Sequence, residues 1–355
     1  MGLIEDINKY TIAIQLNPDD AESYFNRGMA YYQSGQHDRA IKDFKKVIRI
    51  NPNSHEAYNS RGLVYTQLGK YERAVTDFDK TIELNPNSYL PYNNRGNAYQ
   101  GLKQYELAIQ DFDKAIEFNP NDYMIYHNRG NAYLYSGQFK LAIQDFNKAI
   151  ELNLNSTESY NNRGTSYDKL GQSELAIQDF DKAIELNPNH ANAYYNRGLS
   201  YRNMNQYELA IQDYDKAIKL NPNNFAIYTN RGNAYQFLKQ YELAVQDYNK
   251  AIELSPNNFV IYTNRASSYI SLKQYEKAID DCNKAIKFNP NFTDAYYNRG
   301  LAYVGLEQYK RAIQDFDKAV ELNPNHCLAY VYRSNTYKKL SEADLKIAKQ
   351  LGYNG

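Results

Sequence analysis

The sequence lacks tryptophan, and it has only two cysteines, Cys282 and Cys327, among 355 residues. Two cysteines cannot hold a chain of this length together, and so few are typical of a reducing compartment, so we expect a cytoplasmic protein. The N-terminus has no basic stretch followed by an apolar core, which excludes a secretory signal. No apolar run approaches the roughly 18 residues that a membrane span needs, so we expect no membrane partner.

An excess of charge is also absent, because 41 Lys and Arg residues balance 41 Asp and Glu residues. This balance argues against nucleic acid as a partner, which would require a basic stripe. The five histidines follow no metal-binding spacing, and the glycines form no phosphate-binding loop. We therefore expect no metal, no cofactor and no enzymatic activity. The histidines are His37, His55, His127, His190 and His326.

Evenly spaced prolines divide the chain into units of 34 residues. Nine full units cover residues 21–326, with partial units at 1–20 and 327–355, and Leu154 takes the one mark that lacks a proline. A period of roughly 20 to 50 residues indicates a solenoid or a propeller instead of separate globular domains. The prolines are Pro18, Pro52, Pro86, Pro120, Pro188, Pro222, Pro256, Pro290 and Pro324.

Within each unit, numbered from position 1 at Ala21, the recurrent residues follow helical spacing. Tyr occupies positions 4 and 11, Gly position 8 except at Ala266, Ala position 20, and an aromatic residue position 24 except at Cys282. This pattern predicts helix A over about positions 2–14 and helix B over about positions 16–30. Asn-Pro-Asn at positions 31–33 ends helix B, because proline cannot continue a helix. One helix pair cannot bury its apolar face, so the units should stack into an all-α solenoid.

The sequence Tyr-x-x-Arg-Gly-x-x-Tyr, followed by Ala-x-x-x-Phe-x-x-Ala and Pro, resembles the tetratricopeptide repeat. The resemblance covers nearly the whole chain, with Tyr in place of the usual Trp at position 4 and Arg in place of Leu at position 7. It implies a right-handed superhelix of helix-turn-helix units, in which helix A lines the concave face and helix B the convex face.

Arginine at position 7 and aspartate at position 23 occur together in all nine units. We predict an Arg–Asp pair, within a unit or to the next, and favour a structural ion pair over a row of arginines for anionic ligands, because the two counts match unit by unit. The central pairs would be formed by Arg95, Asp111, Arg129, Asp145, Arg163 and Asp179.

Asparagine recurs at position 6 in eight of nine units, with Ser60 as the exception. Positions 2, 6, 9 and 13 lie opposite the buried edge of helix A and should face the groove. Asparagine is unfavourable within a helix, so its recurrence needs a reason, and an amide both donates and accepts hydrogen bonds. The row is similar to the asparagine ladder in the tetratricopeptide domain of O-linked N-acetylglucosamine transferase, which implies contact with a peptide backbone. The alternative is that these amides bond within or between repeats. The candidate groove residues are Asn94, Asn128, Asn162, Asn196, Asn230 and Asn264, with Asn97, Asn131 and Asn233 at position 9.

The two ends of the chain do not complete a unit. Residues 3–16 match helix B without its helix A, which suggests a segment of a longer protein. At the other end, Tyr330, Arg333 and Tyr337 begin another helix A. Ser341 to Asp344 then resembles a capping box that would start a short final helix B, stopped by Gly352. We expect this last helix to serve as the polar cap of the array.

These features predict a protein-interaction scaffold that binds an extended peptide segment of a partner in its groove. One alternative is an architectural or targeting module of a larger, enzymatic protein. Another is self-association through the repeat ends. A chaperone-tail binder of the same family is disfavoured, because it would use lysines at positions 2 and 5, and no full unit has them.

Overall fold

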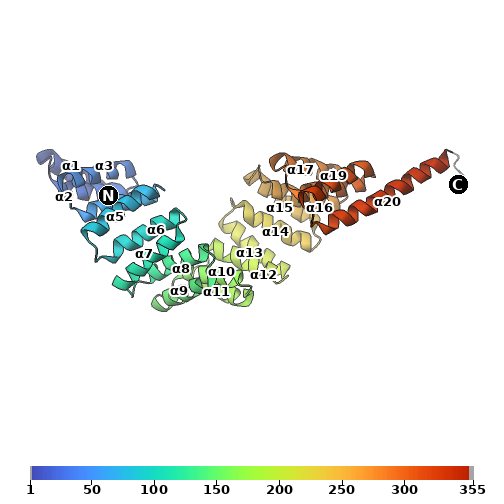
Figure 1. Cartoon of the computed structure of the whole chain (residues 1–355). Coiled ribbons are helices and arrows are strands. Elements are labelled where there is room, and N and C mark those ends of the chain that lie inside the picture. The colour runs from blue at the N-terminus through green and yellow to red at the C-terminus, as the bar shows by residue number, and fades with distance from the viewer. Residues whose placement is uncertain (1, 352–355) are drawn as a thin grey trace. The chain divides into compact units, whose positions relative to one another are not determined.

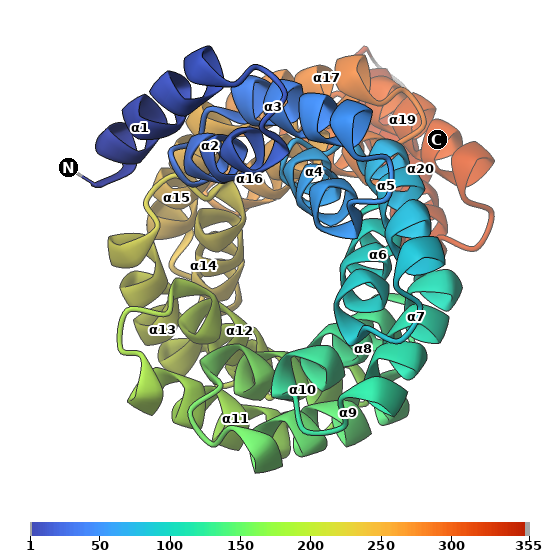
Figure 2. The ribbon, with the colours of Figure 1, turned by 90° about the vertical axis from the view of Figure 1, so that its left-hand side faces the viewer.

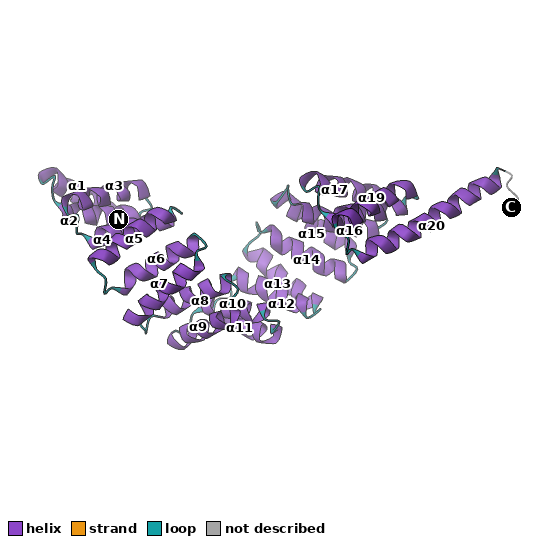
Figure 3. Ribbon diagram, in the orientation of Figure 1, coloured by secondary structure: helices purple, strands orange, loops and turns teal. Residues whose placement is uncertain are grey.

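The computed structural model describes residues 2–351, which form twenty α-helices and no strand (Figures 1 and 3). The prediction of an all-α repeat fold is therefore confirmed. Contacts group the chain into two compact units, which meet in sequence between Leu186 and Asn187, and each is described by itself. The first unit contains α1 (Gly2–Leu16), α2 (Ala21–Gln33), α3 (His37–Ile50), α4 (His55–Gln67), α5 (Tyr71–Leu84), α6 (Tyr89–Gly101), α7 (Tyr105–Phe118), α8 (Tyr123–Tyr135), α9 (Phe139–Leu152), α10 (Thr157–Lys169) and α11 (Ser173–Leu186). The second contains α12 (Ala191–Asn203), α13 (Tyr207–Leu220), α14 (Phe225–Phe237), α15 (Tyr241–Leu254), α16 (Phe259–Ser271), α17 (Tyr275–Phe288), α18 (Thr293–Gly305), α19 (Tyr309–Leu322) and α20 (Cys327–Gln350).

The repeat pattern sets where these helices begin and end. The even-numbered helices α2 to α18 are helix A and cover repeat positions 1–13, and the odd-numbered helices α3 to α19 are helix B and cover positions 17–30. Helix B ends before position 31, where Asn51 has an extended backbone because it precedes Pro52. Between helices A and B, position 15 has a left-handed backbone, with φ of +75° at Gly35 and +59° at Lys103.

Each unit has an inner face made by its A helices. In the first unit, α4, α6, α8 and α10 lie on the inner side, and α5, α7, α9 and α11 lie outside them (Figure 2). In the second unit, α12 and α14 take the inner position and α13 and α15 the outer one (Figure 2). We use "inner face" below for this surface of each unit.

Small residues at fixed positions bring helices A and B together. Alanine at position 20 is fully buried in every repeat, as in Ala142. Glycine at position 8 faces the aromatic ring at position 24, so a Cβ added to Gly130 would lie only 2.7 Å from Cε1 of Phe146. Repeat 8 shows the reciprocal change, because Ala266 stands where glycine otherwise does and Cys282 replaces the ring, and both are fully buried.

The C-terminal end corrects one prediction. The capping box at Ser341 to Asp344 does not form, and α20 continues without a break through 24 residues from Cys327 to Gln350. Ser341 falls at position 15, where the other repeats turn with a left-handed residue, glycine in four of them. The stretch from Tyr337 to Gln350 contains neither glycine nor proline, so nothing in it interrupts the helix. Gly352, expected to stop this helix, lies outside the described residues.

Candidate functional site

The position-6 asparagines of the first unit are partly buried on the A helices, and three of them, Asn94, Asn128 and Asn162, donate to the preceding repeat. Nδ2 of Asn94 lies 3.0 Å from Oδ1 of Asn59, and Nδ2 of Asn128 lies 3.1 Å from Oδ1 of Asn93. Asn162 instead donates to a position-9 residue, Asn131, at 2.8 Å. The row therefore ties one A helix to the next, as the alternative reading of the asparagines anticipates.

The second unit repeats this arrangement with different acceptors. Nδ2 of Asn264 lies 3.1 Å from Oδ1 of Asn233, and that oxygen also accepts a 2.7 Å hydrogen bond from the Tyr248 hydroxyl. Asn230 donates to the Tyr195 hydroxyl at 3.0 Å. Asn196 is partly buried like the others, and its backbone oxygen accepts from Ser200.

These internal bonds leave part of the side-chain amide unused at three of the position-6 candidate groove asparagines. An asparagine side chain has two N–H donors and an oxygen with two lone pairs. Within residues 2–351, the side-chain oxygens of Asn94, Asn128 and Asn264 accept no hydrogen bond, and each amide nitrogen makes only one. By contrast, the oxygen of Asn162 accepts from Asn161, and that of Asn230 accepts from Arg202.

Of the predicted position-9 residues, two belong to internal networks. Asn131 donates to Nε2 of His127 at 3.0 Å and accepts from Asn162, and His127 Nδ1 lies 2.8 Å from the Ser159 hydroxyl. Because an amide nitrogen only donates, Nε2 of His127 is unprotonated and Nδ1 carries the hydrogen. Asn97 is partly buried and makes no side-chain hydrogen bond with the described residues.

The arginine at position 7 pairs with the aspartate at position 23 of the same repeat. In repeat 3, Nε of Arg95 lies 2.8 Å from Oδ2 of Asp111, and Nη2 lies 2.6 Å from Oδ1. The nine aspartate side chains are only 3–8% exposed, so these bidentate pairs lie between the two helices. The pairs are Arg27–Asp43, Arg61–Asp77, Arg95–Asp111, Arg129–Asp145, Arg163–Asp179, Arg197–Asp213, Arg231–Asp247, Arg265–Asp281 and Arg299–Asp315.

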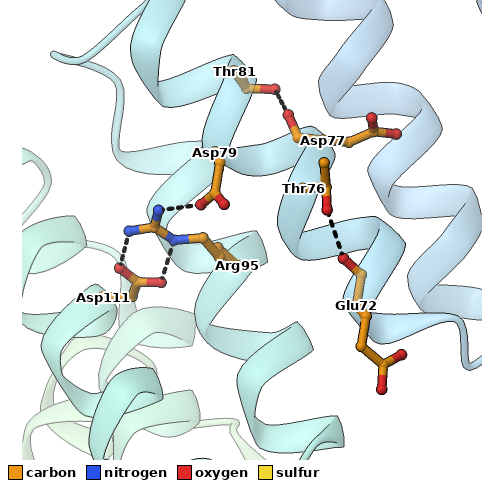
Figure 4. Close-up of polar contacts among 7 residues, drawn as sticks. All are labelled: Glu72, Thr76, Asp77, Asp79, Thr81, Arg95 and Asp111. Carbon is orange, nitrogen blue, oxygen red and sulfur yellow. Dashed lines mark hydrogen bonds and ion pairs between the residues drawn. The ribbon is translucent and has the colours of Figure 1, made fainter.

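Sequence reasoning missed the third contact of this arginine, which crosses to the preceding repeat. Nη1 of Arg95 donates to Asp79 at position 25 of repeat 2, so the guanidinium lies between two carboxylates (Figure 4). Position 25 is Asp or Asn in repeats 2 to 9, a signal that could have revealed the contact. The same contact joins Arg129 to Asp113, Arg163 to Asn147, Arg231 to Asp215, Arg265 to Asn249, Arg299 to Asn283 and Arg333 to Asp317.

The surroundings keep these arginines charged and occupied. Burial acts to lower the pKa of Arg95, but its hydrogen bonds to Asp111 and Asp79 outweigh burial and raise the pKa. The rings of Tyr92 and Tyr99 each lie 5.8 Å from the guanidinium carbon. With its hydrogen bonds and both ring contacts inside the protein, this side chain is poorly placed to bind an anionic ligand.

Groups suited to chemistry are sparse in the described part of the chain. Cys282 is buried, which raises the pKa of its thiol and keeps it protonated, as suits a packing residue. Among residues 2–351, no three His, Cys, Asp or Glu side chains gather where they could hold a metal ion. Over the same residues, no helix is both long and apolar enough to cross a membrane.

The family model of the tetratricopeptide repeat matches the chain nine times in succession, and the chain belongs to this family. Repeats of this family form protein-interaction scaffolds that are typically not catalytic, and this chain is a scaffold of that class. None of the curated proteins compared with the chain matches it. The nine matches are residues 21–54, 55–88, 89–122, 123–156, 157–190, 191–224, 225–258, 259–292 and 293–326.

Several solved structures share the fold. A tetratricopeptide repeat protein from Parabacteroides merdae is 22% identical, with 70% of this chain and 98% of that chain covered and a TM-score of 0.53. In the structure of the APC/C hetero-tetramer Cut9–Hcn1, the matching chain is 14% identical, with 93% of this chain and 80% of that chain covered and a TM-score of 0.56. Pseudomonas aeruginosa pilF is 20% identical, with 57% and 93% covered and a TM-score of 0.51. At these identities the likeness concerns the fold alone.

Proposed function

We propose that this scaffold binds an extended peptide segment of a protein partner along the inner face, through the asparagine row. The observation that carries the proposal is the unused acceptor and donor on Asn94, Asn128 and Asn264. An extended peptide offers one N–H and one C=O per residue, and one amide can pair with both. Such pairing reads the backbone and not the side chains, so it suits partners of different sequence.

The bonds between repeats support this function instead of competing with it. In each bond the asparagine amide donates one hydrogen to the preceding A helix, as Asn128 does to Asn93, and the bond fixes the orientation of the donating side chain. A side chain held in place loses less conformational entropy when it binds a ligand.

The two free thiols, Cys282 and Cys327, are compatible with the reducing, cytoplasmic location that we also propose.

The test replaces Asn94 and Asn128 together with alanine in the full chain. We expect the immobilised variant to retain about tenfold less, or lower still, of a mixed library of short unstructured peptides than the parent does. Each replaced asparagine would lose two hydrogen bonds to the peptide, of roughly 0.5–1.5 kcal/mol each. The matched control replaces Asn59 and Asn93, which breaks the same two bonds between repeats but keeps the ladder amides. Equal retention by both double variants would refute peptide binding through the row.

A further inference from the structure

Two cavities of the first unit lie at successive junctions between repeats, beside the first turns of A helices. One, of about 270 Å³, lies between repeats 1 and 2 and has Phe25 and Val47 in its wall. The other, of about 300 Å³, lies between repeats 2 and 3 and has Leu90 and Pro91 in its wall. Ser60 lines the second cavity, and it is the one position-6 residue that is not asparagine, so its smaller side chain leaves more room there.

Carboxylates line both cavities. Glu22 and Glu56 border the first, and Glu56 also borders the second. Both glutamates are exposed, and the side chain of Glu56 is 58% exposed, with polar contacts to His55 and Ser54 alone among residues 2–351. In the five repeats of this unit, no lysine or arginine occupies positions 2, 5, 6 or 9, so no cation on these positions neutralises the two glutamates.

The chemistry of these cavities fits a basic side chain. The apolar wall suits the methylene stem of a lysine or arginine, and the carboxylates suit its charged end. An anion is the wrong occupant, because Glu22 and Glu56 stand in the first turns of α2 and α4 and already supply the negative charge that a helix N-terminus favours. Position 2 is apolar in repeats 3 and 4, where Leu90, in the wall of the second cavity, and Met124 are each 47% exposed.

We propose that the two acidic cavities bind lysine or arginine side chains of the extended peptide, that Leu90 contacts the methylene stem in the second cavity, and that Met124 contacts an apolar side chain beyond it. This inference rests on the proposed function and adds the class of peptide. Neighbouring helices pack about 10 Å apart and an extended chain advances about 3.3 Å per residue, so the two basic residues should be separated by roughly three positions.

The experiment measures the binding of a positional-scanning library of fluorescent peptides to the full chain. The parent protein should select lysine and arginine at two positions, and added salt should weaken that selection. Replacing Glu22 and Glu56 together with glutamine should reduce affinity for basic library members about two- to fivefold per carboxylate and leave neutral members unchanged. The matched control replaces Glu72 and Glu106 with glutamine, which are exposed residues of the outer helices α5 and α7.

The outcomes separate the two proposals. Selection that disappears in the Glu22 and Glu56 variant and persists in the Glu72 and Glu106 variant would support the basic-peptide specificity. Peptide binding without a preference for basic residues, or an equal preference in both variants, would overturn this specificity and leave the proposed function standing. If no library member binds the parent protein, the proposed function fails, and this inference fails with it.

Discussion

At the scale of single residues, the protonation state of His127 controls a hydrogen-bond network that includes the asparagine row. Its neutral ring accepts from Asn131 and donates to Ser159, and Asn131 in turn accepts from the ladder residue Asn162. Burial lowers the pKa of His127, while the charge of Glu158 acts weakly in the opposite direction. Protonating Nε2 would place a hydrogen against the Asn131 amide, so the charged ring breaks this network.

A histidine whose pKa is lower in the folded state than in the unfolded state stabilises the fold above its unfolded pKa of about 6.5, and that contribution is lost as the pH falls. We expect the free energy of unfolding to decline between about pH 7 and pH 5, and His127→Asn to flatten that decline. Asparagine already occupies this position in repeats 2, 3 and 5. Urea titrations across this pH range test the expectation, and parallel pH profiles for parent and variant would contradict it.

At the same scale, the sequence could predict which residues recur but not all of their partners. The Arg–Asp pairs were expected from matched counts at positions 7 and 23, and each lies within one repeat. The third contact of Arg95 to Asp79 was missed, because it depends on how adjacent repeats are rotated, which a single helical wheel does not contain. The partners of the asparagines were open for the same reason.

At the scale of helices, the close approach of A and B depends on complementary volumes at positions 8 and 24. Repeat 8 is the natural test, since Ala266 and Cys282 together replace a glycine and a ring. We expect Cys282→Phe alone to destabilise the chain by about 1–3 kcal/mol, because the ring would meet the Ala266 methyl group. Adding Ala266→Gly should recover most of this loss, because every other repeat combines glycine with a ring.

A double-mutant cycle on these two residues measures the coupling from urea unfolding midpoints. As a control, Gly130→Ala should destabilise repeat 4, where a Cβ would lie 2.7 Å from the Phe146 ring. Additive effects of the Cys282 and Ala266 substitutions would show that the two positions do not share one space.

Helix boundaries were largely predictable, with one instructive failure. Proline at position 32 and helical spacing placed both ends of both helices of each repeat to within one residue. The capping box at Ser341 failed because a serine can start a helix only if the chain first leaves the preceding one. In the other repeats a left-handed residue, such as Gly35 or Gly137, makes that exit at the same position.

At the scale of the molecule, stability of a repeat array is roughly the sum of the repeats and of the junctions between neighbours. Arginine at position 7 contributes to these junctions through its contact with position 25, as Arg129 does with Asp113. The junction between repeats 1 and 2 differs, because position 25 of repeat 1 is Lys45. Arg61 therefore pairs with Asp77 alone among the described residues.

This difference predicts a weaker junction that one substitution can strengthen. Lys45→Asp should give Arg61 its second carboxylate, which more than offsets the lost attraction between Lys45 and Asp77, for a gain of about 0.2–1 kcal/mol because position 25 is partly exposed to solvent. The reverse change, Asp113→Lys, should weaken the junction between repeats 3 and 4 by a similar amount. Native-state hydrogen exchange should show slower opening of α2 to α4 in the first variant and faster opening of α7 and α8 in the second. If Lys45→Asp leaves exchange in α2 to α4 unchanged, the contact at position 25 orients the arginine without stabilising the junction, and the strength of the array then lies in its apolar packing.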